Sequence, residues 1–267
     1  GRDRAARRII TGEGPTKVGP SVSSLLLMLC SGPFAAGNFS ATTTFTTDYV
    51  FRGQSFSDEG PAIQGSLDWG YNGFYAGIWG SNLELGDGTI ELDYYGGYAG
   101  TVGPIDYDAM LIYYHFAATS DDSVGGVDPD QFETWLTLSH TFAGAPFEPT
   151  LGVFWAWSPD FTLEDGTSHY INGTLALSLP QGFGVDFGYG YQDVEGDKTT
   201  PSGWLGGTST QSGFDYTHWQ VGLSKEVVGF GLDLRYHDTD ENSDFVAYWG
   251  TDDQIDERIV FTISRSF

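Results

Sequence analysis

The chain of 267 residues has little positive charge. Its 11 Lys and Arg residues stand against 36 Asp and Glu residues, which gives a formal net charge of −25. So large a negative excess repels nucleic acid, which excludes DNA and RNA as partners and favours cations. An acidic surface that keeps the protein soluble, or that suits a saline habitat, explains the same charge equally well.

Cysteine, long apolar runs and helical periodicity are also scarce. The single cysteine, Cys30, lies in a segment that we expect to be removed, which would leave a mature chain without disulfides. After residue 38 no helical pattern persists, and no apolar run reaches the about 20 residues that a membrane-spanning helix needs. Charged residues make up 18 % of the chain, against about 25 % in a typical soluble domain. These absences argue against both a helical membrane protein and an ordinary soluble domain.

Residues 1–37 have the features of a secretory targeting segment. A basic stretch with Arg7, Arg8 and Lys17 precedes a short apolar run, and small residues follow that run. The apolar run is too short to span a bilayer. We therefore expect this segment to be removed, with Asn38 as the first residue of the mature chain and residues 38–267 as a single domain.

Beyond residue 38 the sequence alternates between apolar and polar side chains. In one segment Phe183, Val185 and Phe187 alternate with small or acidic residues, so they share one face of a strand. Segments of about ten residues with this alternation, each closed by a turn, are the signature of an outer-membrane β-barrel. Twelve are present, at residues 39–52, 61–71, 74–83, 90–101, 105–117, 131–142, 147–158, 168–179, 183–192, 216–225, 230–237 and 255–267.

The links between these segments alternate in length. Short links fall at residues 72–73, 102–104, 143–146, 180–182 and 226–229, and longer ones at 53–60, 84–89, 118–130, 159–167, 193–215 and 238–254. We therefore predict an all-β fold, a transmembrane antiparallel up-and-down barrel of about 12 strands with short periplasmic turns and longer extracellular loops. An even strand number places both ends of the barrel on the periplasmic side of a Gram-negative outer membrane.

A soluble β-sandwich or lectin-like domain shows the same alternation with its faces inverted. Aromatic residues at the strand ends favour the barrel, because they would form its interfacial girdle. These aromatic residues are Tyr49 and Phe51, Trp69 and Tyr71, and Trp155 and Trp157.

The last segment ends in an aromatic residue and has one apolar face. Ile259, Phe261, Ile263 and Phe267 share that face, a pattern typical of the assembly signal that outer-membrane proteins present to their insertion machinery. The partners of the folded chain would then be outer-membrane lipid and lipopolysaccharide.

Residues 46–82, TTDYVFRGQSFSDEGPAIQGSLDWGYNGFYAGIWGSN, resemble the opening of the TorF-like porin family of proteobacteria. Residues 91–100, ELDYYGGYAG, resemble the next block of that family. The resemblance is specific over about residues 39–115 and looser beyond them. It implies an outer-membrane barrel with a porin role, and it carries over no catalytic or binding residue.

The same parity predicts which charged residues face the lumen. Charge on the lipid face costs about 2–4 kcal/mol for Arg or Lys at mid-depth, so charged residues belong inside or at the rims. The predicted channel-lining set is Asp48 and Arg52 on the first strand, then Asp68, Glu91, Asp93, Asp106, Asp108, Glu133, Glu148, Asp186, His218, Asp233, Arg235, His237 and Arg258. Equally, Arg52, Arg235 and Arg258 could neutralise neighbouring carboxylates and plug the lumen.

Twelve tilted strands give a backbone diameter of roughly 24 Å, which leaves on the order of 10 Å between side chains. That width suits small hydrophilic solutes or ions, and the acidic excess predicts a preference for cations. A non-conducting structural or adhesive barrel is the main alternative, and conductance separates the two.

Two weaker signals remain. Asp238, Asp240, Asn242 and Asp244 have a spacing that suits Ca²⁺, although a solvated acidic loop explains it as well. Apart from that possibility we expect no cofactor.

An outer-membrane hydrolase would need a nucleophile and a base within reach of each other. The histidines are scattered along the chain, and Ser139 and His140 are strand neighbours that face opposite ways. A cluster of His237 with Asp238 and Asp240 is the remaining candidate for acid–base chemistry. We therefore predict that the chain is not an enzyme.

Overall fold

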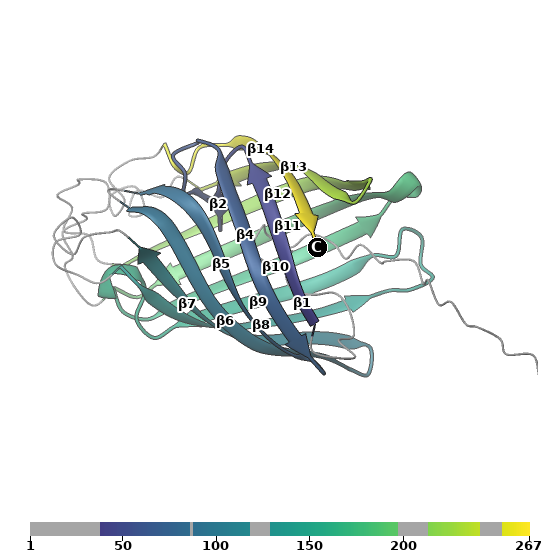
Figure 1. The fold of residues 1–267 in the computed structure, drawn as a ribbon, viewed down its shortest axis with the longest axis horizontal. Coiled ribbons are helices and arrows are strands. Elements are labelled where there is room, and N and C mark those ends of the chain that lie inside the picture. Colours follow the sequence, from purple (N-terminus) through teal and green to yellow (C-terminus); the bar gives the residue numbers. More distant parts are fainter. Residues whose placement is uncertain (1–37, 86–87, 118–128, 197–212, 241–252) are drawn as a thin grey trace, which may run out of the picture.

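The computed structural model describes residues 38–85, 88–117, 129–196, 213–240 and 253–267. Within them, twelve antiparallel strands form a closed barrel, in which each strand pairs with its neighbours along the chain and β1 pairs with both β4 and β14 (Figure 1). The predicted fold class is confirmed. The barrel strands are β1 (Asn38–Thr46), β4 (Ala62–Tyr71), β5 (Phe74–Leu85), β6 (Gly88–Val102), β7 (Ile105–Ala117), β8 (Gln131–Thr141), β9 (Thr150–Ser158), β10 (Ser168–Ser178), β11 (Phe183–Val194), β12 (Phe214–Val227), β13 (Phe230–Thr239) and β14 (Arg258–Ser266).

The two ends of the barrel differ in the length of their links. At one end two-residue turns such as Asn72-Gly73 and Val228-Gly229 join the strands, with both residues of each turn at positive φ. Such turns match the twist of paired strands. Residues 38 and 267 lie at this short-turn end, and the strand ends that the longer links join lie at the other, on the left of Figure 1. Helical structure in the described residues is limited to 3-10 turns at Thr162–Glu164 and Pro180–Gly182, and no helix there is long and apolar enough to cross a membrane.

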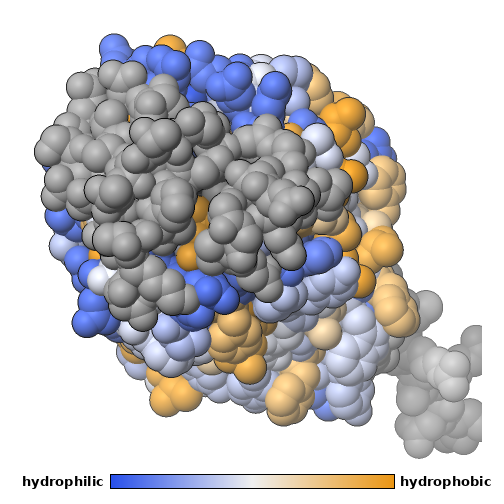
Figure 2. Space-filling view, turned by 90° about the vertical axis from the view of Figure 1, so that its left-hand side faces the viewer, coloured by the Kyte–Doolittle hydropathy of each residue, from blue (hydrophilic) through white to orange (hydrophobic). Residues whose placement is uncertain are grey.

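The apolar face of the strands points outward. Leu67 on β4 is 68 % exposed, whereas its neighbours Ser66 and Asp68 are each 5 % exposed. A soluble sandwich would bury Leu67 and expose the polar pair, so this burial pattern contradicts the sandwich and fits a wall that faces lipid. Figure 2 shows apolar residues along the outer wall of the barrel and hydrophilic residues around its long-loop end.

The first strand is shorter than predicted. It ends at Thr46, and residues 47–61, here called the lumen hairpin, leave the wall and fold inside the ring of strands. The hairpin contains β2 (Val50–Phe51) and β3 (Gln54–Ser55), joined by a tight turn at Arg52 and Gly53 with φ of 49° and 85°. The prediction that Asp48 and Arg52 lie on the first strand is therefore wrong.

Gly53 is favoured at this turn by its positive φ, and a second reason is the space around it. A Cβ atom there would lie 2.4 Å from Thr239 Oγ1 and 2.7 Å from His218 Cβ, so only glycine lets the hairpin tip approach the wall this closely. The aromatic residues of the hairpin are also misplaced in the sequence prediction. Tyr49 is buried against Phe56 and Trp79 inside the barrel instead of lying in an interfacial girdle.

A second correction concerns the start of β9. The strand begins at Thr150, not at residue 147, because Phe147 and Glu148 have φ of 63° and 39° and form part of a turn. Glu148 is therefore an exposed turn residue and not part of the lumen wall. The other strand ends lie close to the predicted positions.

Candidate functional site

A buried ion pair holds the lumen hairpin to the opposite wall. Arg52 Nη1 donates to Glu133 Oε1 on β8 at 2.9 Å, and Arg52 Nη2 donates to Glu133 Oε2 at 2.7 Å. Nη1 also donates to Gln192 Oε1 on β11 at 3.0 Å, and the guanidinium lies 4.4 Å from the centre of the Tyr170 ring. Two parallel charged hydrogen bonds fix both distance and orientation. Arg52 therefore ties the hairpin across the lumen.

Neutral hydrogen bonds attach the tip of the hairpin to β12 and β13. Gln54 Nε2 donates to the Tyr216 hydroxyl at 2.6 Å, and that hydroxyl donates to the Arg52 carbonyl at 3.0 Å. Thr239 Oγ1 donates to the Gly53 carbonyl at 2.8 Å. The backbone of the turn is thus satisfied by the barrel wall, as a buried turn must be.

The base of the hairpin is organised around Asp48. Its carboxylate accepts hydrogen bonds from Ser55 Oγ at 2.7 Å, Ser57 Oγ at 2.9 Å and Arg258 Nη1 at 2.9 Å. Arg258 belongs to β14 and also lies 3.6 Å from Glu59. Asp48 and Arg258 therefore fasten the hairpin to the last strand.

A second guanidinium crosses one strand of the wall. Arg235 on β13 donates to the Asp186 carboxylate on β11 at 2.6 and 2.9 Å, and it also pairs with Asp233 at 3.1 Å. Between these strands lies β12 with Gly222, where a Cβ atom would be 2.4 Å from Arg235 Nη2. The glycine provides the space through which the guanidinium reaches Asp186.

Two carboxylates on β6 have no such partner. Glu91 is 1 % exposed and Asp93 is 0 % exposed, and neither forms an ion pair with any residue that the structure describes. Glu91 Oε2 and both Asp93 oxygens also lack hydrogen bonds within the described ranges. The Trp79 indole N–H, on the residue that pairs with Asp93, also lacks a hydrogen bond within the described ranges, and the Tyr49 hydroxyl lies against Glu91. Buried carboxylates are costly without a partner. Glu91 and Asp93 are therefore the carboxylates of the described lumen whose burial is least compensated by hydrogen bonds or ion pairs.

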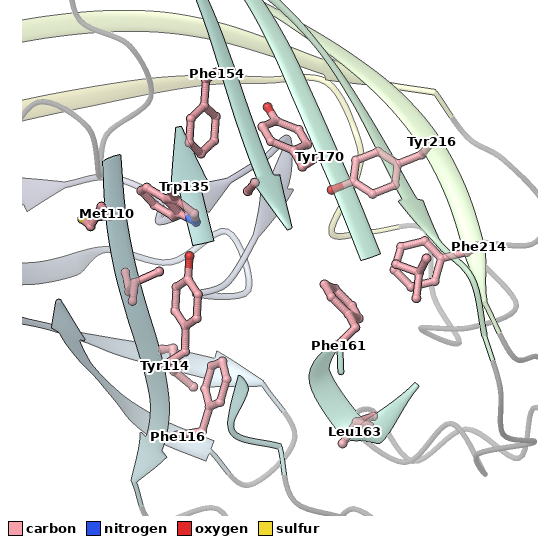
Figure 3. Close-up of a cluster of buried hydrophobic side chains, with 14 of the residues drawn as sticks. Met110, Tyr114, Phe116, Trp135, Phe154, Phe161, Leu163, Tyr170, Phe214 and Tyr216 are labelled. Carbon is pink, nitrogen blue, oxygen red and sulfur yellow. The ribbon is translucent and has the colours of Figure 1, made fainter. Parts of the chain in front are cut away.

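A small cavity of about 30 Å³ lies between the hairpin and the wall, next to Arg52 and Glu91. Half of the residues that line it are aromatic, and Figure 3 shows Tyr114 and Phe116 on one side of the space with Phe161 and Tyr216 on the other. The polar residues at its edge include Gln131 on β8.

The structure brings most of the predicted lining residues into the lumen. Those buried on inward-facing strand positions are Asp68, Glu91, Asp93, Glu133, Asp186, His218, Arg235 and His237. Asp108, Asp233 and Arg258 are partly buried, and Asp106 is exposed near the short-turn end. Asp68 and Asp108 accept hydrogen bonds from tyrosine hydroxyls, Tyr95 and Tyr75 respectively.

The sequence prediction missed the uncharged residues of the lumen. Tyr170 and Tyr216 occupy inward positions on β10 and β12, and Gln192 faces inward on β11. The parity that selected the charged residues also places these three inside, so it would have found them if applied to every side chain.

Other predicted features lie outside the lumen or outside the described ranges. Ile259, Phe261 and Phe267 are exposed on the outer face with Ile263 half-buried beside them, and their role as an assembly signal stays a prediction. Asp238 and Asp240 are described, but Asn242 and Asp244 are not, and neither is the targeting segment 1–37 with Cys30. Among the residues that the structure does describe, no three His, Cys, Asp or Glu side chains are arranged to hold a metal ion.

The profile of a bacterial family of unknown function, Gcw_chp, matches residues 30–267. The chain belongs to the Gcw_chp family. No curated protein sequence matches it. The match neither supports nor contradicts the TorF-like resemblance.

Several solved barrels have a similar shape. The KdgM porin has a TM-score of 0.52 at 9 % identity, over 85 % of this chain and 99 % of the porin. The KdgM porin in complex with disordered oligogalacturonate gives 0.51 at 9 % identity, over 85 % and 99 %. The NanC porin gives 0.47 at 10 % identity, over 85 % and 98 %. At such low identity the likeness to KdgM shows a shared fold and nothing finer.

Proposed function

We propose that this chain is a porin-like channel of a Gram-negative outer membrane that passes small hydrophilic solutes and prefers cations. The observation that carries the proposal is the closed ring of strands with an apolar outer face and a polar inner face. Such a wall separates an aqueous path from lipid. The likeness in fold to the KdgM porin supports the same class of function.

The cation preference rests on the charge of the lumen. Among the described residues, carboxylates outnumber guanidinium groups there. The carboxylates are Asp48, Asp68, Glu91, Asp93, Asp108, Glu133, Asp186 and Asp233, and the guanidinium groups of the same described set are Arg52, Arg235 and Arg258. A narrow path of one sign concentrates counter-ions and excludes ions of the same sign. The oligogalacturonate named with KdgM is a polyanion, and this lumen would repel it.

The lumen hairpin sets the expected size limit. The width of about 10 Å expected from the strand number assumes an empty barrel, whereas the hairpin and its ion pair occupy the long-loop half of this lumen. We therefore expect conductance well below that of an open barrel of the same strand number.

Liposome swelling tests this proposal with the refolded chain. The rate of swelling should fall steeply as neutral sugars increase in size, and lysine should enter faster than glutamate, although the two have similar lengths. Faster entry of glutamate would overturn the cation preference. Absence of swelling in every solute, for both the wild type and a variant with a released hairpin (Arg52→Ala), would overturn the channel and favour a structural barrel.

A further inference from the structure

Two positive charges lie on the outer face of the barrel, at its short-turn end. Of the five lysine and arginine side chains that the structure describes, Arg52, Arg235 and Arg258 are held by carboxylates inside the lumen. The other two, Lys225 on β12 and Arg265 on β14, form no ion pair with any described residue. The chain has a formal net charge of −25, so two outward cations without a carboxylate are an exception and attract a negative partner.

Both side chains lie where the apolar band of the outer wall ends. Lys225 has the same strand parity as Leu223, which is 44 % exposed, and it lies two residues before the end of β12. Arg265 has the same parity as Phe261, which is 40 % exposed, and it lies one residue before the end of β14. The register places the two on either side of β13, about 10 Å apart across the strands and about 7 Å along them. At the edge of such a band the lipid headgroups meet the protein.

Aromatic rings hold both cations against the outer wall. Lys225 Nζ lies 4.1 Å from the centre of the Phe183 ring. The Arg265 guanidinium lies 4.8 Å from the centre of the Phe230 ring and 5.4 Å from that of Phe267. A cation over an aromatic face keeps its N–H donors, because the ring takes the place of neither a carboxylate nor a phosphate. The donors are therefore positioned in advance and remain available to acceptor oxygens.

The exposed carboxylates of the short-turn end do not neutralise this pair. They are Asp106 on β7, Glu148 in the turn before β9 and Glu226 on β12. Glu226 follows Lys225 in the sequence, but successive side chains of a strand point to opposite faces. None of the three carboxylates forms an ion pair with Lys225 or Arg265.

We propose that Lys225 and Arg265, here called the basic rim, bind the phosphate of an anionic phospholipid. The acyl chains of that lipid then lie along the outward apolar residues, such as Leu223 and Phe261, toward the middle of the membrane. A zwitterionic phospholipid carries an ammonium group of its own beside the phosphate, so it gains less from the two side chains. The leaflet at the short-turn end is the one that we expect to be periplasmic. The site goes beyond the proposed channel and does not depend on conduction.

Native mass spectrometry of the full chain, refolded in detergent, tests the proposal. The probes are phosphatidylglycerol and phosphatidylcholine with the same acyl chains, each titrated separately. A basic residue near an anionic membrane surface contributes about 1 kcal/mol, which is about fivefold in affinity for each charge. The wild type should therefore bind its first phosphatidylglycerol at least about tenfold more tightly than its first phosphatidylcholine.

Substitutions in the basic rim locate the site. Lys225→Gln and Arg265→Gln should each weaken phosphatidylglycerol binding about fivefold, and the double variant should bind the two lipids alike. Lys225→Arg is the matched control, because it keeps the charge, and its affinity should stay within about twofold of the wild type. Phosphatidylcholine binding in the same spectra should change less than about twofold in every variant, which shows that the outer wall is intact.

Equal affinity of the wild type for the two lipids, or unchanged phosphatidylglycerol binding in the double variant, would overturn the proposal. Inorganic phosphate that displaces phosphatidylglycerol at equal concentration would also overturn it, since the phosphate alone would then occupy the basic rim. Lipid-free dimers that disappear in the double variant would assign the basic rim to a second copy of the chain and exclude the lipid as its occupant.

Discussion

The two halves of the lumen are built from the same strands but are filled differently. In the long-loop half the inward side chains are large and buried, and the hairpin residue Arg52 crosses to Glu133 and Gln192. In the short-turn half the inward positions of β8 and β12 carry the small residues Ser139 and Ser224, which are partly exposed, although Asp68 and Tyr75 are buried in that half. Strand parity alone predicts only which side chains point inward, and it does not distinguish the two halves. The difference comes from one loop that folds inward, so we place the narrow part of the path at the long-loop end.

A substitution that releases the hairpin from the wall should have the largest effect on the difference in packing between the two halves. Arg52→Ala leaves Glu133 buried without its partner, which should lower the free energy of unfolding by about 3–5 kcal/mol and open the long-loop half. Urea unfolding in lipid vesicles gives the first quantity and single-channel conductance the second.

The double variant Arg52→Ala/Glu133→Ala serves as the control for the buried charge. It should recover much of the lost stability, because no unpaired carboxylate remains, and should keep the raised conductance. Conductance equal to the wild type in both variants would show that the hairpin does not narrow the path.

A substitution in the turn of the hairpin should cause a smaller loss of stability, and the chain offers a matched control for it. Gly53→Ala introduces a side chain at a φ of 85° and in collision with Thr239 and His218, so we expect a loss of about 2 kcal/mol or more. Gly103→Ala places the same change at a φ of 61° in a short turn with no atom within 4 Å. It should cost only the backbone strain, about 1 kcal/mol. Equal losses in urea unfolding would argue against close packing of the hairpin tip.

Substitutions of carboxylates in the two halves should also differ in how much stability they cost. Asp48→Asn weakens the charged hydrogen bond to Arg258 at the base of the hairpin and should cost about 1–2 kcal/mol. Asp106→Asn changes an exposed residue of the short-turn half and should stay within about 0.5 kcal/mol of the wild type. The same unfolding series measures both, and a larger loss for Asp106→Asn would reverse the assignment of the packed half.

The sequence predicted the wall well because alternation is a local property of each strand. All twelve barrel strands follow from it, and so do the inward positions of Glu91, Asp186 and Arg235. The lumen hairpin could not be predicted in this way, since residues 47–52 continue the alternation of β1 although the chain has left the wall. Its turn uses a positive φ at Arg52, a residue type that gives no local signal of one.

The residues that the hairpin contacts could not be predicted from the sequence either. Arg52 and Glu133 are 81 residues apart, and Gln54 and Tyr216 are 162 apart. Parity shows that Glu133 and Tyr216 face the lumen, but it does not show which inward residue of another segment each one meets. The small cavity beside the hairpin depends on these pairings, so the same limit applies to it.

We propose that a polar, acidic lumen, narrowed by residues 47–61, conducts cations. Single-channel recording of the wild type under a gradient of potassium chloride tests it most directly. We expect small unitary currents whose reversal potential has the sign of potassium selectivity, and larger currents for Arg52→Ala. A reversal potential of the opposite sign, or no current through either protein, would contradict it.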